Sequence, residues 1–251
     1  MSDGPNGPTT ADRAISTTVI AAAPEDRRTL CAIGWVVAAF ASFSCADAII
    51  KWLSAGYPVL QLVFTMALFA LGPLAALVAC EGGLAAMRLR RPGLVALRAG
   101  LLVGNSVLGF SALKLLPLAD AYTVFFAGPM MITALAVPLL KERVGWRRWS
   151  AVVVGFLGVL VILRPGAGTL GLGHLAAVAS TLFYALSVIV LRRIGAAEPG
   201  GGLLLAQMAG LLLATAPTLP FVYTAPHGRD LALMALAGAF NGFAQIGLLK
   251  A

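Results

Sequence analysis

Residues 118–166 read LADAYTVFFAGPMMITALAVPLLKERVGWRRWSAVVVGFLGVLVILRPG, and this stretch decides the class of fold. It contains two apolar runs, 118–140 and 147–163, which a short cluster of basic residues separates. About 20 helical residues cross the roughly 30 Å hydrocarbon core of a bilayer. The stretch therefore predicts two consecutive membrane helices, of which the second is the shorter.

The rest of the chain continues this pattern. Apolar residues make up 60% of the sequence and charged residues 11%, whereas a soluble domain carries about a quarter charged residues. So few charges cannot cover a surface that faces water. The composition predicts an all-α, polytopic membrane helix bundle of about eight helices, with the lipid bilayer as its surroundings. The six further apolar runs are 31–52, 57–79, 93–113, 172–191, 203–223 and 231–250.

Positive charge in alternate connections predicts the orientation, because cytoplasmic loops are enriched in Lys and Arg. One side carries Arg13, Arg27, Arg28, Arg88, Arg90, Arg91, Arg98, Lys141, Arg143, Arg147, Arg148, Arg192, Arg193 and Lys250. The other side carries Lys51, Lys114, Arg164 and Arg229. We therefore expect a multi-pass protein of the cytoplasmic (inner) membrane with a cytoplasmic N-terminus. Residues 1–29 are polar and are predicted to be a disordered cytoplasmic tail.

This distribution also accounts for the formal net charge of +8, so we expect no nucleic-acid partner. The sequence contains no zinc-binding spacing, no glycine-rich phosphate loop and no nucleophile elbow. It therefore predicts no metal, no cofactor and no enzymatic activity.

The sequence also contains an internal repeat. Residues 105–114 read NSVLGFSALK and residues 241–250 read NGFAQIGLLK, each with an Asn nine residues before a Lys. Upstream, Lys51–Pro58 and Arg192–Pro199 have a common spacing of seven. Helices one to three thus correspond to helices six to eight. A repeat of five helices is an odd number, so the second copy must insert upside down, as in many secondary transporters.

The opening stretch resembles the end of the first repeat of EamA-domain transporters, in the drug/metabolite transporter superfamily. The motifs that carry the resemblance are Leu118–Ala121, Gly128–Pro129, Lys141–Glu142, Gly155 with Gly158, and the sequence GYPVLQLVF at 56–64. One position departs from the pattern, since Met66 stands where the family often has an Arg.

The resemblance implies two inverted five-helix repeats, ten helices in all. The first EamA repeat is expected at 30–166. The second is expected at 167–251 as a truncated repeat of three helices, with the last two missing.

Several polar side chains inside the predicted helices are candidates for a substrate site, because a polar group in a bilayer is costly. Asn105 and Asn241 occupy equivalent positions of the repeat, and Gln245 lies one turn after Asn241. They are expected either to bond neighbouring helices or to contact substrate at the axis between the repeats. Tyr122 and Tyr184 are predicted to face the same cavity.

Asp47 has two interpretations. It can pair with Lys51, one turn later on the same face, and so form a neutral pair near the outer surface. Alternatively, it can line the cavity as a carboxylate that responds to protons or to substrate.

The resulting hypothesis is a secondary transporter that moves small metabolites by alternating access. Amino acids, related metabolites and drug-like amphiphiles are the substrate classes that the resemblance implies. The alternative is a truncated, non-transporting membrane module, either a pairing subunit or a gene fragment. Transport by a homodimer would instead indicate that a second copy fills the gap.

Overall fold

The computed structural model describes residues 24–83, 89–141, 145–163, 171–195 and 198–250. These residues are almost entirely helical, and no strand occurs among them. The elements are α1 (Pro24–Leu53), α2 (Val59–Cys80), α3 (Pro92–Leu115), α4 (Leu118–Phe125), α5 (Gly128–Leu140), α6 (Trp146–Leu163), α7 (Leu172–Ile194), α8 (Gly200–Thr215), the 3-10 turn η3 (Ala216–Thr218), α9 (Leu219–Val222) and α10 (Gly228–Lys250). The predicted all-α class is therefore confirmed.

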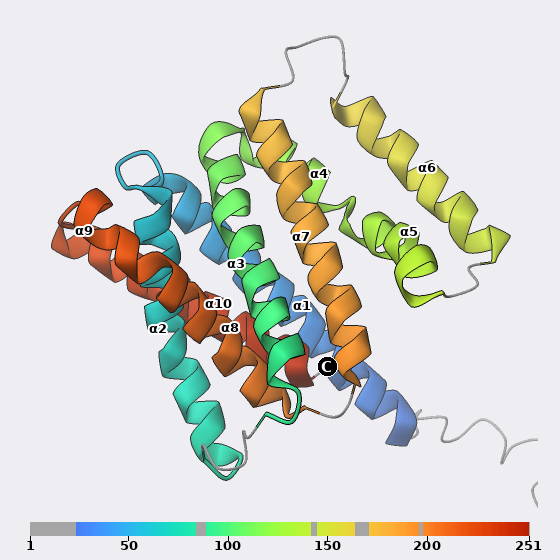
Figure 1. Ribbon diagram of the computed structural model, residues 1–251, viewed down its shortest axis with the longest axis horizontal. Coiled ribbons are helices and arrows are strands. Elements are labelled where there is room, and N and C mark those ends of the chain that lie inside the picture. The colour runs from blue at the N-terminus through green and yellow to red at the C-terminus, as the bar shows by residue number, and fades with distance from the viewer. Residues whose placement is uncertain (1–23, 84–88, 142–144, 164–170, 196–197, 251) are drawn as a thin grey trace, which may run out of the picture.

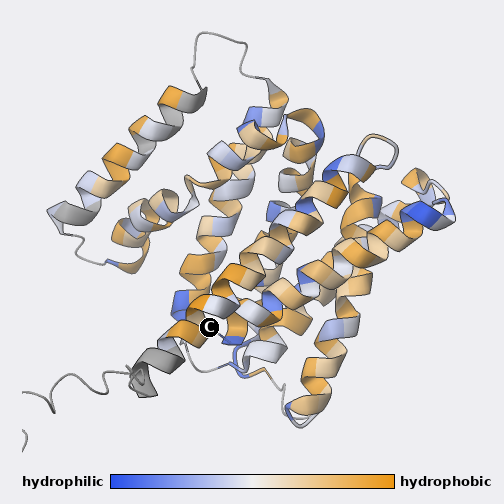
Figure 2. Cartoon of the chain, turned by 180° about the vertical axis from the view of Figure 1, so that it is seen from behind, coloured by the Kyte–Doolittle hydropathy of each residue, from blue (hydrophilic) through white to orange (hydrophobic). Residues whose placement is uncertain are grey.

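Seven described segments are long and apolar enough to cross a membrane. They are Thr29–Leu53, Val59–Cys80, Pro92–Leu115, Leu118–Leu140, Leu172–Ile194, Gly200–Val222 and Gly228–Lys250. Each coincides with one of the predicted runs, and the remaining run at 147–163 forms α6. Hydrophobic residues cover the long helical surfaces, whereas hydrophilic residues gather toward the helix ends (Figure 2). This distribution is that of a multi-pass membrane protein.

Several helix boundaries differ from the expected ones, and those of α1 and of the fourth span differ for a clear physical reason. α1 begins at Pro24, inside the predicted tail, where proline suits the first helical position. The fourth span is divided, because α4 ends at Phe125 and α5 begins at Gly128. Proline clashes with the carbonyl four residues earlier, so Pro129 ends the helix at Phe125 instead of bending it at its own position. The rest of the predicted tail, residues 1–23, lies outside the described residues.

The helices pack as two blocks. In the first block, α10 packs against both α1 and α2. In the second block, α3 packs against both α7 and α8, and α4 and α5 lie against α7. The blocks meet chiefly where α2 contacts α8. α6 packs on α4 and α5 at the edge of the bundle beyond α7 (Figure 1).

Small residues bring α10 unusually close to α2. A Cβ atom on Gly238 would lie 2.8 Å from the Met66 carbonyl oxygen, and one on Gly242 would lie 3.0 Å from the Ala70 carbonyl oxygen. Glycines four residues apart share one helix face, which lets two backbones approach closely in a membrane. This contact fixes the first block and leaves α1 on the opposite side of α10.

The contacts between helices agree with the helix correspondence that the sequence repeat predicts. If helices one to three correspond to helices six to eight, α1 is equivalent to α7, α2 to α8 and α3 to α10. A twofold operation then exchanges the α1–α10 contact with α7–α3, and the α2–α10 contact with α8–α3. The α2–α8 contact maps onto itself. The helix contacts of the two blocks thus exchange under one twofold operation.

Candidate functional site

Asp47 and Tyr122 form a polar contact between the two blocks. The Tyr122 hydroxyl, on α4, donates a 2.7 Å hydrogen bond to Oδ2 of Asp47, on α1. Both residues are half-buried, and both belong to membrane-crossing segments. The Ser44 hydroxyl, one turn before Asp47, also interacts with the Tyr122 hydroxyl. Two of the predicted site residues are therefore brought together from distant parts of the chain.

Lys51 does not pair with Asp47, so the interpretation of a neutral pair is wrong. Its ammonium group instead donates hydrogen bonds to the Leu113 carbonyl and, at 2.7 Å, to the Leu116 carbonyl. These carbonyls belong to the C-terminal end of α3, where carbonyl groups lack partners and the helix dipole favours a cation. Lys51 is thus a second polar contact between the blocks, and it leaves Asp47 without the expected counter-charge.

The residues immediately before Pro58 and Pro199 make equivalent contacts at opposite ends of the bundle. Tyr57 donates a 2.7 Å hydrogen bond to Asp230 near the start of α10, and its oxygen accepts one from the backbone N–H of His227. The hydrogen bond to Asp230 raises the pKa of the Tyr57 phenol. Tyr57 was not among the predicted site residues.

The buried Glu198 holds the start of α3 by hydrogen bonds, as Tyr57 holds the start of α10. Its carboxylate accepts hydrogen bonds from the backbone N–H of Arg90, 2.9 Å from each oxygen, and from that of Arg91. Arg91 and His227 both lie 14 residues before the aligned asparagines of the repeat. Each contact stays within one block and ties a helix of one predicted repeat to the other. The shared position before a proline was the sequence signal that could have identified them.

The two asparagines have different surroundings. The Oδ1 atom and the backbone carbonyl of Asn105 both accept hydrogen bonds, each 3.0 Å long, from the Ser180 hydroxyl on α7. The buried Oδ1 atom of Asn241 has no hydrogen-bond partner among the described residues. Asn105 thus joins two helices, as one of the two expectations proposed.

The remaining candidates stay predictions. Gln245 is half-buried on α10, and Tyr184 is exposed on α7, where its ring lies beside Gly128. Among the described residues, hydrogen bonds join only Asp47 and Tyr122 of the six candidates. Glu142 lies among Lys141, Arg143, Arg147 and Arg148 in the sequence, which predicts a local ion partner, but it lies outside the described residues.

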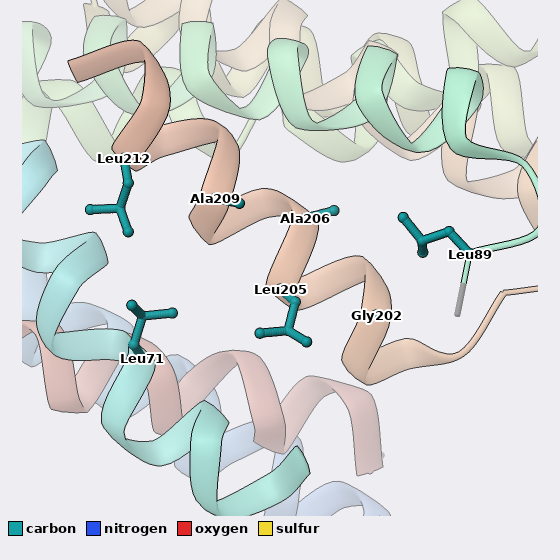
Figure 3. Close-up of a pocket in the computed structure, with 7 residues that line it drawn as sticks. All are labelled: Leu71, Leu89, Gly202, Leu205, Ala206, Ala209 and Leu212. Carbon is teal, nitrogen blue, oxygen red and sulfur yellow. The ribbon is translucent and has the colours of Figure 1, made fainter. Parts of the chain in front are cut away.

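An apolar hollow of about 340 Å³ lies between the blocks, away from the candidate residues. It opens between α2 and α8, and its lining side chains carry no polar group (Figure 3). The lining residues are Leu71, Leu89, Gly202, Leu205, Ala206, Ala209 and Leu212. This surface suits acyl chains and offers nothing that could orient a hydrophilic molecule.

The fold and these contacts define a polytopic α-helical membrane protein whose helices pack as two blocks. Residues 30–164 match the EamA-like transporter family. The chain belongs to this family, whose matching relatives are transporters of the drug/metabolite transporter superfamily.

The similar proteins are of several kinds. A riboflavin transporter of Rhizobium johnstonii is 30% identical, over 89% of this chain and 74% of its own length. An S-adenosylmethionine uptake transporter of Rickettsia felis is 27% identical, over 88% of this chain and 75% of its own length. A solved crystal structure superposes with a TM-score of 0.62 at 22% identity, covering 86% of this chain and 83% of the other, which shows a common fold.

Proposed function

We propose that the protein is a secondary transporter that carries small metabolites across the cytoplasmic membrane by alternating access. Membership of the EamA-like transporter family is the observation that carries this proposal. The names of the relatives point to nucleoside-sized, amphipathic solutes such as S-adenosylmethionine and riboflavin. The polar contact between Asp47 and Tyr122 supplies a place where such a solute can be recognised.

We further propose that residues 30–166 form one repeat and residues 167–251 form part of an inverted second one. The exchange of helix contacts under a twofold operation supports this division. The equivalent positions of Tyr57 and Glu198 also support it. Tyr57 bonds the start of α10, and Glu198 bonds the start of α3, the helix that corresponds to α10 in the repeat. The end of the bundle that holds Arg90, Glu198 and Arg193 faces the cytoplasm in this proposal, because basic residues concentrate there.

The transport movement is a rocking of the first block against the second. Contacts within each block include close backbone packing and buried carboxylate hydrogen bonds, so each block moves as a unit. The boundary between blocks is apolar along α2 and α8 but polar at the end that holds Lys51. Opening toward the outer side requires the Lys51 contact with α3 and the Asp47 contact with Tyr122 to separate.

Uptake by reconstituted protein tests the proposal. The full chain is inserted into liposomes, and entry of labelled S-adenosylmethionine and of riboflavin is followed with and without a pH gradient. Saturable uptake of either compound above protein-free liposomes is the expected result. If correctly folded protein takes up neither compound, with or without the pH gradient, the result would reject transport and favour the non-transporting membrane module. Sizing the same preparation tests the predicted homodimer.

A further inference from the structure

Asp47 is a carboxylate within a membrane-crossing helix that lacks a cationic partner among the described residues. Its one hydrogen bond in this part of the chain comes from the neutral Tyr122 hydroxyl. Lys51, the nearest cation in sequence, is held by the carbonyls at the end of α3. A charged carboxylate can accept about four hydrogen bonds, and leaving it unpaired away from water is costly. Asp47 therefore has unused capacity for a positively charged group.

Two further aromatic rings adjoin Tyr122, the residue whose hydroxyl bonds this carboxylate. The Tyr122 ring makes an edge contact with Phe125 at 5.9 Å between centroids and a tilted contact with Phe126 at 6.0 Å. Phe126 is 70% exposed, so part of this cluster is accessible from outside the described bundle. Aromatic faces attract quaternary ammonium and similar cations, and the attraction strengthens when water is excluded. A carboxylate bonded to one member of an aromatic cluster is the chemistry that recognises a soft organic cation.

We propose that Asp47, Tyr122 and the adjoining Phe125 and Phe126 form a subsite for the positively charged group of the substrate, an ammonium or a sulfonium. This inference rests on the proposed transport function and names the substrate class that it serves. The subsite spans the two blocks, since Asp47 is on α1 and Tyr122 on α4. A cation bound there contacts both blocks, and its presence changes the hydrogen bond that joins them.

Binding to the purified full chain in lipid nanodiscs tests the subsite with two pairs of probes. S-adenosylmethionine is compared with S-adenosylhomocysteine, which lacks the sulfonium charge. Choline is compared with 3,3-dimethyl-1-butanol, its neutral carbon analogue. The expected result is tighter binding of the charged member in at least one pair.

Three substitutions assign the effect to the subsite. Asp47→Asn keeps the shape and removes the charge, and should abolish a cation preference of about 10-fold or more, because the fully alkylated cation is held by charge attraction and by the aromatic rings. Asp47→Glu should restore part of the preference. Asp120→Asn, on the same helix as Tyr122, removes a comparable charge and should leave the preference unchanged.

The outcomes separate the subsite from transport. The subsite is rejected if the wild-type protein does not prefer either cation, if Asp47→Asn retains the preference, or if Asp120→Asn loses it equally. Riboflavin uptake without a cation preference would keep the transport proposal and overturn the subsite. Cation binding that depends on Asp47, with no uptake of any probe, would keep the subsite and reject the transport proposal.

Discussion

Replacing Lys51 by Met removes the ammonium group that joins the end of α1 to the last carbonyls of α3. The methionine retains most of the apolar stem, so the change isolates the hydrogen bonds. A buried hydrogen bond to a charged group contributes about 1.5–3 kcal/mol, and half-burial of Lys51 reduces that contribution through solvent screening. For the two bonds together we expect a loss of about 1–2 kcal/mol. This corresponds to an increase of about 5- to 30-fold in the ratio of outer-open to outer-closed protein.

Spin labels at Ala55 and Leu115 report this ratio, because both residues are exposed and they belong to different blocks. Distances between the labels are measured in nanodiscs by pulsed electron resonance, with the native cysteines replaced. Lys51→Met should enlarge the population at longer distance. Lys114→Met is the matched control, since it removes an exposed positive charge from the same end of the bundle. Identical distance distributions for the two variants would refute the assignment of Lys51 as a contact that closes the outer side.

Three further predictions concern packing, block integrity and topology. Gly238→Ala should lower thermal stability in detergent by about 1–3 kcal/mol, because its Cβ would meet α2 backbone atoms, whereas Gly100→Ala meets nothing within 4 Å and should not. Glu198→Gln should cost about 1.5–3 kcal/mol in unfolding measurements, since one amide oxygen cannot replace a carboxylate that accepts backbone N–H groups from Arg90 and Arg91. A cysteine introduced at Arg90 should react with an impermeant maleimide only from the cytoplasmic side, and labelling of intact cells from outside would reverse the proposed orientation.

The sequence was sufficient for the all-α membrane bundle because hydrophobic length is a local property. Each apolar run of about 20 residues can form only a helix in a bilayer, where unpaired backbone groups are not tolerated. Helix ends were less certain. The run at 118–140 was expected as one helix, yet it divides between Phe125 and Gly128 because Pro129 affects the preceding turn.

The candidate site was only partly predictable, because its contacts join residues that are distant in the chain. Asp47 and Tyr122 were each selected as polar residues in apolar helices, but nothing in the sequence indicated that they touch. The pairing of Asp47 with Lys51 was wrong for a related reason. Proximity along a helix favoured it, whereas the free carbonyls at the end of α3 offer Lys51 better partners.

In the proposed transport cycle, the contrast between the two kinds of contact gives a small solute a way to control the rocking of the blocks. Within a block, backbones touch through Gly238 and Gly242, and such packing tolerates little displacement. Between blocks, the hollow along α2 and α8 has an apolar lining, so directional preference for one arrangement comes from polar contacts elsewhere and not from this lining. The preference then depends on a few polar contacts near Lys51 and Asp47, each of about 1–3 kcal/mol. A ligand that binds Asp47 need supply only a comparable difference in binding free energy to shift the equilibrium between the two arrangements.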